Sequence, residues 1–337
     1  MSVSTLLLES FQGLFDKLPQ QVQRTLLLPT VQKGLALLAT FQALRTFNGY
    51  LSRGAQNNWT RVASWEPSKE LVLLTGGASG IGKQIMKDLA QLKVKIIIID
   101  VQEPDFALPS NVFFYRADIT SSSVVKEVAG RIRKDHGDPT ILINNAGVGF
   151  GGTILSEPEE QIRLTVEVNL LAHFWTVREF LPSMIQKDHG HIITIASLAS
   201  FVTLGETVDY ASSKAAALAF HEGLTQEIRH WYKSKKIRTS IIHPLWVRTP
   251  LIDTLVQARK HFKQPVMSPE KVSSAVVKQI VSRSGGQVII PSSYNGASLL
   301  RGLPNWIQEM VRDKASMTLV TLRELENQID AGENIDS

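Results

Sequence analysis

The chain contains no cysteine among its 337 residues. This absence excludes disulfides, thiolate metal ligands and a cysteine nucleophile. A dense cluster of basic residues is also missing, because the 36 Lys and Arg residues are dispersed and give a net charge of only +5 against 31 Asp and Glu residues. Nucleic-acid binding requires concentrated positive charge, so we expect no nucleic-acid partner. The eight histidines have no metal-ligand spacing, and we expect no metal site.

No apolar run is long enough to cross a bilayer. The best candidate, from Gly34 to Leu44, lies between Lys33 and Arg45 and is about half as long as the roughly 20 residues that a spanning helix needs. Segments on either side of Pro29 instead repeat apolar residues every three or four positions, which predicts amphipathic helices. The first stripe is Val3, Leu7, Phe11, Leu14, Phe15 and Leu18, and the second is Val31, Leu35, Leu38, Phe41 and Leu44.

From about Glu70 onward, short apolar runs rich in β-branched residues alternate with segments of helical period. This alternation predicts an α/β fold with a doubly wound parallel sheet of about seven strands, a Rossmann fold, in one core domain over residues 70–291. Residues 1–69 and the helical tail 292–337 are predicted to be appendages. Strands are expected at 71–75, 95–100, 112–117, 140–144, 191–196, 239–243 and 287–291. Helices are expected near 81–92, 121–136, 160–187, 209–232 and 268–283.

A glycine-rich turn, TGGASGIGKQI, follows the first predicted strand and opens the first predicted helix. Its glycines allow a tight turn and let the backbone approach a pyrophosphate, while the helix dipole attracts that anion. We therefore predict a dinucleotide site here, although a glycine-rich turn without a ligand is the structural alternative. The expected contacts are Thr75, Gly76, Ser79, Gly80, Ile81 and Gly82.

Asp100 ends the second predicted strand, where its carboxylate can accept hydrogen bonds from the adenosine ribose. A 2′-phosphate there would meet like charge, and Ser79 stands where a basic residue would favour NADP. The sequence thus favours NAD over NADP, unless Asp100 only caps a turn. Later strand ends add the expected contacts Asp118, Ile119, Asn145, Ala146 and Gly147.

The stretch VDYASSKAA places Tyr210 four residues before Lys214. Residues at this spacing lie on one face of a helix, and an ordinary solvated pair would contribute only a few tenths of a kcal/mol. The functional alternative is a cation that lowers the pKa of the phenol so that it can exchange protons. A free phenol titrates near pH 10, so exchange near neutrality requires its pKa to fall by about 2–3.

Ordered motifs over roughly residues 70–290 resemble those of the short-chain dehydrogenase/reductase family. They are TGGASGIG, NNAG, VNLLAHF around Asn169, GHIITIASLAS around Ser197, DYASSK around Tyr210, and HPLWVRTP. In that family the tyrosine matching Tyr210 is the general acid/base, and the lysine matching Lys214 binds the nicotinamide ribose and lowers the phenol's pKa. The resemblance implies that Ser197 hydrogen-bonds the substrate oxygen and that Asn169 holds a water linking Lys214 to solvent.

The chain departs from the family pattern at Pro244-Leu245, where Pro-Gly is usual. The following Val247 and Thr249 match residues that contact the nicotinamide amide. Leucine does not readily adopt glycine's backbone angles, which leaves the path of this loop open. Apolar residues here match the segment that covers the substrate and favour an apolar substrate, although a lid needs apolar residues merely to close. They are Trp246, Leu251, Ile252, Leu255, Val256 and Phe262.

The resemblance implies an NAD(P)-dependent oxidoreductase that interconverts a lipophilic alcohol, such as a steroid, retinoid or fatty alcohol, and its carbonyl compound. The alternative is a cofactor-binding family member that has lost turnover and acts as a scaffold or regulator. Because Asn169, Ser197, Tyr210 and Lys214 are all present, the enzyme is favoured. Relatives of this fold form homodimers through the helices holding Asn169 and Tyr210. The outer faces of these helices are expected to carry Leu171, Phe174, Ala217 and Phe220, unless these residues face the sheet.

A weaker resemblance, carried by the apolar N-terminal segment and the tail at 296–314, links the chain to membrane- and lipid-droplet-associated hydroxysteroid and retinol dehydrogenases. We therefore expect residues 1–55 to lie on an endoplasmic-reticulum or lipid-droplet surface, with the catalytic domain facing the cytosol. The alternative is a cytoplasmic protein whose N-terminal helices pack on the core. The sequon Asn58-Trp59-Thr60 would carry a glycan in a secretory lumen, and we expect none.

Overall fold

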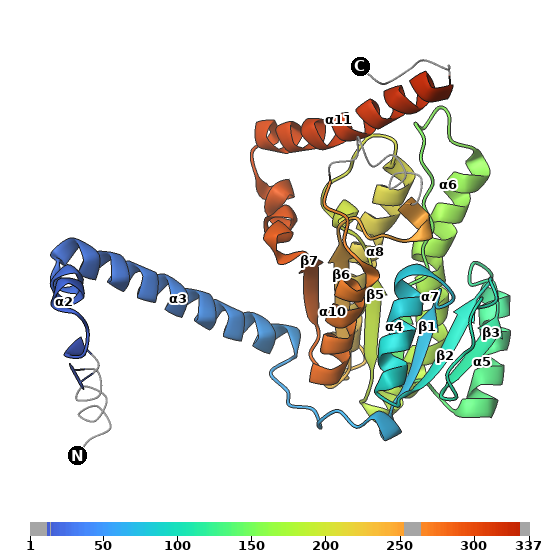
Figure 1. The fold of residues 1–337 in the computed structure, drawn as a ribbon. Coiled ribbons are helices and arrows are strands. Elements are labelled where there is room, and N and C mark those ends of the chain that lie inside the picture. The colour runs from blue at the N-terminus through green and yellow to red at the C-terminus, as the bar shows by residue number, and fades with distance from the viewer. Residues whose placement is uncertain (1–11, 14, 253–263, 331–337) are drawn as a thin grey trace. The chain divides into compact units, whose positions relative to one another are not determined.

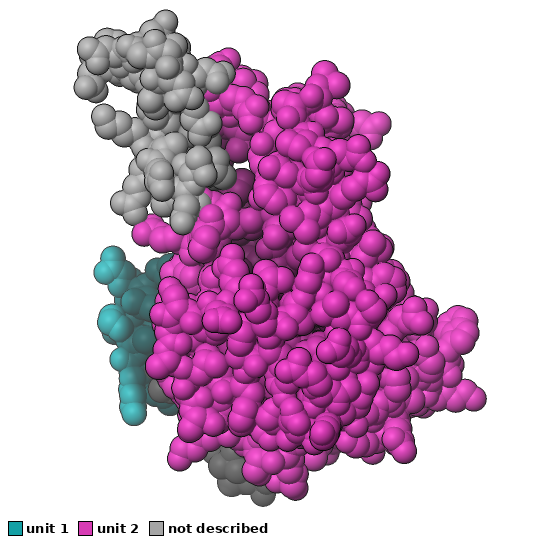
Figure 2. Space-filling view, turned by 90° about the vertical axis from the view of Figure 1, so that its right-hand side faces the viewer, with its two compact units in different colours: residues 1–55 teal, residues 56–337 magenta. Residues whose placement is uncertain are grey.

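The computed structural model describes residues 12–13, 15–252 and 264–330. The chain divides into two compact units, residues 1–55 and residues 56–337, which Figure 2 colours separately. The larger unit takes in residues 56–69, which the sequence assigned to the N-terminal appendage, and also the C-terminal tail.

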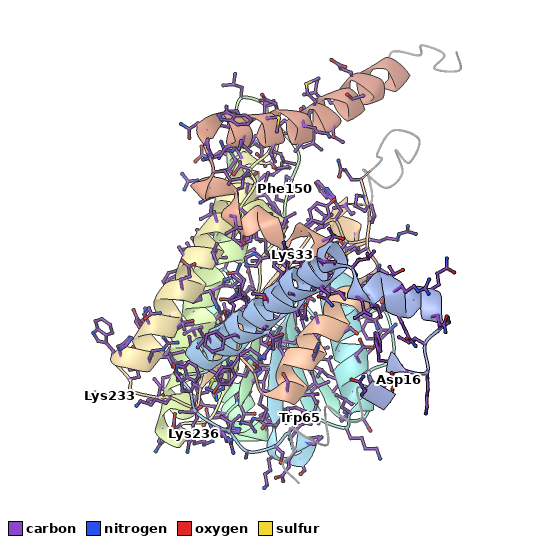
Figure 3. All side chains as sticks on the ribbon, turned by 90° about the vertical axis from the view of Figure 1, so that its left-hand side faces the viewer. Asp16, Lys33, Trp65, Phe150, Lys233 and Lys236 are labelled. Carbon is purple, nitrogen blue, oxygen red and sulfur yellow. The ribbon has the colours of Figure 1, made fainter. Side chains whose placement is uncertain are left out.

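The smaller unit consists of helices separated near Pro29, as the sequence predicted. They are α2 (Gln20–Leu27) and α3 (Pro29–Gln56), and neither contains a buried residue. Lys33 is labelled near the start of α3 in Figure 3. Leu35, Leu38, Phe41 and Leu44 of the second stripe are all exposed, by 49% to 66%. Among the described helices, none is both long and apolar enough to cross a membrane. Val3, Leu7, Phe11 and Leu14 of the first stripe lie outside the described residues.

The larger unit is built on a parallel sheet of seven strands in the order β3-β2-β1-β4-β5-β6-β7 (Figure 1). The predicted doubly wound fold is therefore confirmed, and each predicted strand is present. The strands are β1 (Leu71–Thr75), β2 (Lys95–Asp100), β3 (Val112–Arg116), β4 (Ile141–Asn144), β5 (His191–Ile195), β6 (Arg238–Pro244) and β7 (Gly286–Ile290). The order reverses between β1 and β4, which is where ligands bind in such sheets.

Alternate residues of the strands face two separate hydrophobic layers. In β1, Leu71 and Leu73 pack with one buried cluster, whereas Val72 and Leu74 pack with the other. The first layer is covered by α5 (Ser122–His136), α7 (Ala172–Lys187) and α8 (Val208–His230), and the second by α4 (Gly80–Gln91) and α10 (Pro269–Ser282). Since both faces are covered, the middle of a strand such as β2 is a continuous apolar run, as the sequence showed.

The predicted single helix over 160–187 is wrong in one respect. The chain forms α6 (Glu159–Val166), then a π-helical segment η2 (Glu167–Leu171), and only then α7. Such π-turns often occur at functional sites, because the extra residue per turn redirects a side chain. Asn169 lies at the centre of η2 and is fully buried.

The amino edge of the sheet carries a buried polar network. Glu70 precedes β1; one of its carboxylate oxygens accepts a hydrogen bond from Arg283 at 3.0 Å, and the other lies 3.1 Å from Nε2 of His189. Arg238 begins β6, is 3% exposed, and donates to the carbonyl oxygens of Asn57 at 2.9 Å and Thr60 at 2.7 Å. Arg238 thus fastens residues 57–60 to the sheet.

The C-terminal tail is helical, as expected, and comprises η5 (Ser292–Gly302) and α11 (Asn305–Asp330). Leu319 of α11 is buried against Leu204, Trp246 and Val266. Arg323 forms an ion pair with Glu206 at 3.0 Å. The helix α11 therefore packs on the loops that follow β5 and β6. The remaining short helices are η1 (Pro67–Lys69), η3 (Leu198–Ser200) and η4 (Pro250–Ile252).

Candidate active site

The glycine-rich loop between β1 and α4 has a backbone that larger residues could not adopt. Gly76 and Gly80 have positive φ angles of 67° and 52°. A Cβ at Gly82 would collide with the carbonyl oxygen of Gly76, and one at Gly76 would lie 2.7 Å from Cα of Ala146. The three glycines are therefore required by the tight turn itself, which leaves backbone amides at the N-terminus of α4 facing the crevice.

Thr75 and Asn145, which were predicted to contact the cofactor, make hydrogen bonds that shape this loop. Thr75 Oγ1 accepts from the backbone N–H groups of Asn145 at 3.0 Å and Ala146 at 3.1 Å. Asn145 Nδ2 donates to the carbonyl oxygens of Thr75 at 3.0 Å and Gly76 at 2.9 Å. These bonds join the carboxyl ends of β1 and β4 at the point where the strand order reverses.

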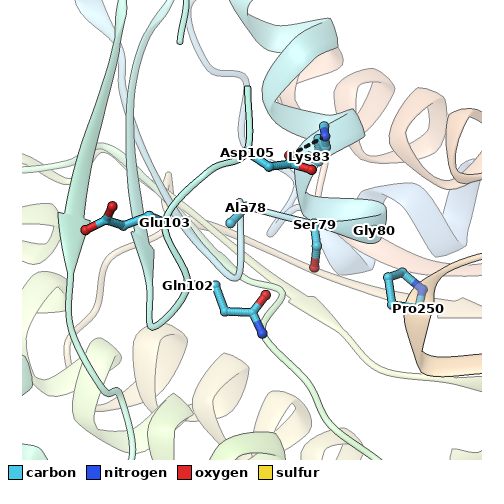
Figure 4. Close-up of a pocket in the computed structure, with 8 residues that line it drawn as sticks. All are labelled: Ala78, Ser79, Gly80, Lys83, Gln102, Glu103, Asp105 and Pro250. Carbon is cyan, nitrogen blue, oxygen red and sulfur yellow. Dashed lines mark hydrogen bonds and ion pairs between the residues drawn. The ribbon is translucent and has the colours of Figure 1, made fainter. Parts of the chain in front are cut away.

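A cavity of about 360 Å³ lies between the glycine-rich loop and the segment after β2 (Figure 4). Asp100 contacts two residues of its lining, because its carboxylate accepts from the backbone N–H groups of Ala78 and Gln102, each at 3.0 Å. Both carboxylate oxygens keep further lone pairs with which to accept hydrogen bonds. The lining residues are Ala78, Ser79, Gly80, Lys83, Gln102, Glu103, Asp105 and Pro250.

The loop after β6 returns to the glycine-rich turn. Its Thr249 is so close that a Cβ on Gly80 would lie 3.2 Å from Cγ2 of Thr249. Val247 is buried and pairs with Met267 in a short bridge. The open question about Leu245 is answered, since it extends the strand pairing with an N–H bond to the carbonyl of Ile290 at 2.8 Å and does not adopt a positive φ.

Asp118 and Ile119 follow β3, at the same edge. The carboxylate of Asp118 accepts from the backbone N–H of Thr120 at 2.9 Å and from its hydroxyl at 2.8 Å, so it caps a turn. Ile119 is buried in the core. Of these two, Asp118 alone has an exposed side chain from which to reach a ligand.

Ser197 and Tyr210 come together from β5 and α8. Ser197 lies just after the end of β5, and its Oγ accepts from the backbone N–H of Ala199 at 3.2 Å. The Ser197 hydroxyl is close enough to the Tyr210 phenol to lower its pKa. The hydroxyl groups of Ser197 and Tyr210 thus lie near each other, with the Tyr210 ring against Gly149.

Lys214 lies on the same helix face as Tyr210, as the spacing predicted. Its Nζ is 5.6 Å from the centre of the Tyr210 ring and donates to the carbonyl of Ile195 at 3.1 Å. Lys214 is 4% exposed, and burial lowers its pKa to about 8. A solvated surface pair is therefore excluded for these two side chains.

Asn169 and Gly147 complete the group. A Cβ on Gly147 would lie 3.3 Å from both Oδ1 of Asn169 and Nζ of Lys214. Asn169 donates to the carbonyl of Val148 at 2.8 Å and to Ser213 Oγ at 3.0 Å, and accepts from the N–H of Val148 at 2.9 Å. Both of its donor hydrogens are used, so Asn169 fixes the loop after β4 against α8.

The lowering of the Tyr210 pKa that Lys214 and an oxidised nicotinamide would produce together stays a prediction. Burial is the largest influence on the phenol and raises its pKa, while the hydrogen bond with Ser197 lowers it. Desolvation disfavours the charged phenolate, and Lys214 does not reverse that cost. A further positive charge next to the phenol is needed to make it a proton donor and acceptor near neutrality.

Comparison with known proteins agrees with this geometry. Residues 70–260 match the family described as short chain dehydrogenase. The chain belongs to the short-chain dehydrogenase/reductase family.

Relatives of this short-chain dehydrogenase are named as dehydrogenases. It is 44% identical to "Dehydrogenase RED2" of Cochliobolus heterostrophus over 62% of this chain and 79% of that protein. It is 32% identical to human "Estradiol 17-beta-dehydrogenase 11" over 74% and 84% of the two chains. Among solved structures, a 4-hydroxyisoleucine dehydrogenase complexed with NADH shares the fold, with a TM-score of 0.58, 21% identity and coverage of 66% and 96%. The protein is therefore an oxidoreductase of this family.

The residues of this short-chain dehydrogenase fit a nicotinamide dinucleotide. The glycines form a cradle that any Cβ would fill, and the cavity above Asp100 adjoins it. Asp100, Ser79 and the α4 amides would hold the adenosine and pyrophosphate part. Val247, Thr249 and Lys214 would hold the nicotinamide part.

Sequence reasoning missed some residues of the dehydrogenase site. A Cβ on Gly149 would lie 2.8 Å from the Tyr210 ring, so glycine is required there. His243 is fully buried, and its Nδ1 lies 3.0 Å from the carbonyl of Ser197. Asp209, next to Tyr210, is also buried, and burial together with Asp209 raises the pKa of Glu157. The sequence signals were the glycine-rich run GVGFGG for Gly149 and the motifs DYASSK and HPLWVRTP, which begin with Asp209 and His243.

The residues expected at the homodimer surface and in the substrate lid of the dehydrogenase differ in exposure. Ala217 was expected on the outer face of α8, but it is fully buried and cannot contact a second copy. Leu171 and Phe174 are 37% and 43% exposed, and Phe174 contacts the Phe220 ring at 4.7 Å.

Of the expected lid, Trp246 packs on α11, Leu251 is exposed and Ile252 is buried. Leu255, Val256 and Phe262 lie outside the described residues.

Proposed function

We propose that the protein is an NAD-dependent dehydrogenase or reductase that interconverts a lipophilic alcohol and its carbonyl compound. The observation that carries this proposal is the convergence of Ser197, Tyr210 and Lys214 beside the glycine-rich cradle. An inactive scaffold would not need a buried lysine beside a half-buried phenol on one helix face, since a buried charge is costly to desolvate.

The side chains have distinct roles in the proposed reaction. A bound nicotinamide supplies the hydride acceptor or donor. Ser197 donates a hydrogen bond to the substrate oxygen and holds it near Tyr210. Tyr210 takes the hydroxyl proton in oxidation and returns one in reduction. Lys214 binds the nicotinamide ribose and, together with the positive charge of the oxidised ring, lowers the pKa that burial has raised.

Asn169 has a more structural role than the sequence implied. Its side chain is occupied by Val148 and Ser213. We propose that it keeps the π-turn and the loop after β4 in place, so that Lys214 retains its position against Gly147. The water that the family pattern implies would then depend on the backbone of η2.

Asp100 supports the choice of NAD. It is placed at the cavity and already oriented by two backbone N–H groups. A ribose diol can donate to its remaining lone pairs, whereas the 2′-phosphate of NADP would be repelled.

The apolar surroundings support a lipophilic substrate. Trp246, Leu204 and Val266 form a cluster with Leu319 of α11 next to the loops that carry Ser197 and Val247. Several relatives are named as hydroxysteroid or estradiol dehydrogenases. We propose a steroid, retinoid or long-chain alcohol as the substrate class.

We also propose that the N-terminal helices bind a membrane or lipid-droplet surface, with the catalytic unit in the cytosol. The exposed apolar residues of α3, including Phe41 and Leu44, support this. Asn58 Nδ2 donates to the carbonyl of Lys235 at 3.1 Å, an atom that a glycan would occupy. Homodimerisation through the surface around Leu171 and Phe174 is a further part of the proposal.

The test is to assay purified full-length protein with NAD and with NADP against sterols, retinoids and long-chain alcohols. We expect turnover with NAD and at least one of these classes. Absence of turnover in both directions with all three classes, together with retained cofactor binding, would support the scaffold alternative.

A further inference from the structure

The loop between β2 and β3 places acidic residues against two cations, Lys83 and Arg116. Lys83, in the first turn of α4, is the one Lys or Arg among the residues that line this cavity. Its Nζ lies 2.9 Å from Oδ1 of Asp105 (Figure 4). The same ammonium is 4.1 Å from the centre of the Phe106 ring. Lys83 is therefore held by two neighbouring residues of one loop.

Arg116 is bordered by the same loop. It ends β3, directly opposite Asp100 in the strand register. Its guanidinium lies 3.8 Å from Glu103, and both side chains are more than 70% exposed. This pair is longer and more exposed than the Lys83 pair, so it neutralises Arg116 less completely.

The side chains that line the cavity carry a net negative charge. The lining contains Lys83, Glu103 and Asp105, one cation against two carboxylates. Asp100 adds a third carboxylate at the base, where it bonds to Ala78 and Gln102. A ribose diol donates hydrogen bonds and tolerates this environment, whereas a phosphate monoester is favoured by a cation whose charge is not already compensated by a carboxylate.

We propose that Asp105, supported by Glu103, is a second determinant of cofactor specificity in addition to Asp100. Asp105 withholds Lys83 from a 2′-phosphate, and without it the lysine could turn to that phosphate. This inference rests on the proposed preference for NAD. Asp105 disfavours NADP indirectly, because it keeps the Lys83 ammonium paired. Direct repulsion between Asp105 and the phosphate is not the whole effect.

The experiment measures dissociation constants of NAD and NADP for the full-length protein, by tryptophan fluorescence or calorimetry at low ionic strength. Asp105→Asn should improve NADP binding relative to NAD by about fivefold, the upper range for an exposed ion pair. Glu103→Gln should give about a twofold change. Glu309→Gln is the matched control, because it removes one carboxylate from another exposed ion pair, with Arg312 on α11. It should leave the ratio unchanged.

A double substitution identifies the mechanism. Lys83→Met in the otherwise native chain should leave the NAD-to-NADP ratio within about twofold, because the charge is already paired. In the Asp105→Asn background, Lys83→Met should abolish the gain. If Asp105→Asn improves NADP binding equally with methionine at position 83, the effect is loss of repulsion alone and the proposal is overturned.

Failure of this inference is separable from failure of the proposed function. Asp100→Ser serves as the reference, since it should improve relative NADP binding whatever Asp105 does. A response to Asp100→Ser with none to Asp105→Asn would overturn the role of Asp105 and keep the proposed preference for NAD. A native protein that binds NADP more tightly than NAD would overturn both.

Discussion

Both edges of the parallel sheet bury polar side chains, but the hydrogen bonding of these side chains differs between the two edges. At the amino edge, Glu70, His189, Arg283 and Arg238 bond to one another or to backbone carbonyls. At the carboxyl edge, Lys214 donates to a single described carbonyl and Asp100 retains free lone pairs. Polar groups that satisfy one another stabilise the fold, whereas those with unused capacity can bind a ligand. The difference predicts that substitutions at the amino edge affect stability and those at the carboxyl edge affect chemistry.

The largest effect on stability should come from Arg238→Met. The substitution removes the guanidinium hydrogen bonds to the carbonyl oxygens of Asn57, Thr60 and Lys235. We expect a loss of about 3–5 kcal/mol in the free energy of unfolding and a fall in Tm of about 10 °C. Thermal unfolding and activity per folded molecule should be measured together. An unchanged Tm, or a loss of activity in fully folded protein, would contradict the difference between the two edges. Arg238→Lys should give an intermediate loss of stability.

Tyr210→Phe should have the opposite profile. It removes the exchangeable proton and keeps the ring that packs against Gly149. We expect kcat to fall by about 100-fold or more, while Tm and the dissociation constant of NAD stay close to native values. Steady-state kinetics and calorimetry decide this. Retention of more than about a tenth of the native rate would contradict the acid/base role.

The buried histidines predict how the free energy of unfolding depends on pH. Burial lowers the pKa of His173 and His191 to about 3, and that of His221 and His243 to about 4. Below the ordinary value of 6.5 the unfolded chain binds protons that the folded chain does not. Stability is therefore full above about pH 6.5 and decreases as the pH falls toward these lowered values.

His173→Phe tests this dependence, because neither ring nitrogen of His173 has a hydrogen-bond partner among the described residues. The slope of unfolding free energy against pH should decrease by about 1.4 kcal/mol per pH unit between about pH 6 and 4. Urea titrations over that range measure it. An unchanged slope would mean that His173 takes up a proton in the folded protein.

The smallest expected effect is a change of cofactor preference. Asp100→Ser together with Val101→Arg removes a repelling carboxylate and adds a phosphate partner. Preference should move toward NADP by about tenfold, as measured by kcat/KM with each cofactor. Native protein that already prefers NADP by this factor would refute the assignment of Asp100, and Val101→Arg alone should give a smaller change.

Much of this arrangement could be predicted from the sequence, because it depends on local patterns. The buried runs such as Lys95 to Asp100 have the length and β-branched content of covered strands, and the Tyr210–Lys214 spacing fixes a shared helix face. The glycine-rich turn is equally local, since its positive φ angles are required by the turn itself.

The remainder depended on contacts between distant segments. The π-turn at Asn169 has an ordinary helical sequence and is stabilised by Val148 and Ser213. Gly149 is required only because the Tyr210 ring packs on it. The face of Ala217 could not be assigned, because α8 is apolar on more than one side and periodicity does not tell which side meets the sheet. The desolvation of Tyr210 likewise follows from packing and not from its neighbours in sequence.

The fastening of residues 57–60 by Arg238 has a mechanical consequence. A tension transmitted along the chain from before Asn57 would reach the folded enzyme at the first residue of β6. That attachment lies at the opposite end of the strand from the loop with Val247 and Thr249. The strands would carry such a load along their length, in shear, through the ladders of neighbouring strands. A load entering here would therefore reach the sheet at the edge opposite to that of Ser197 and Lys214.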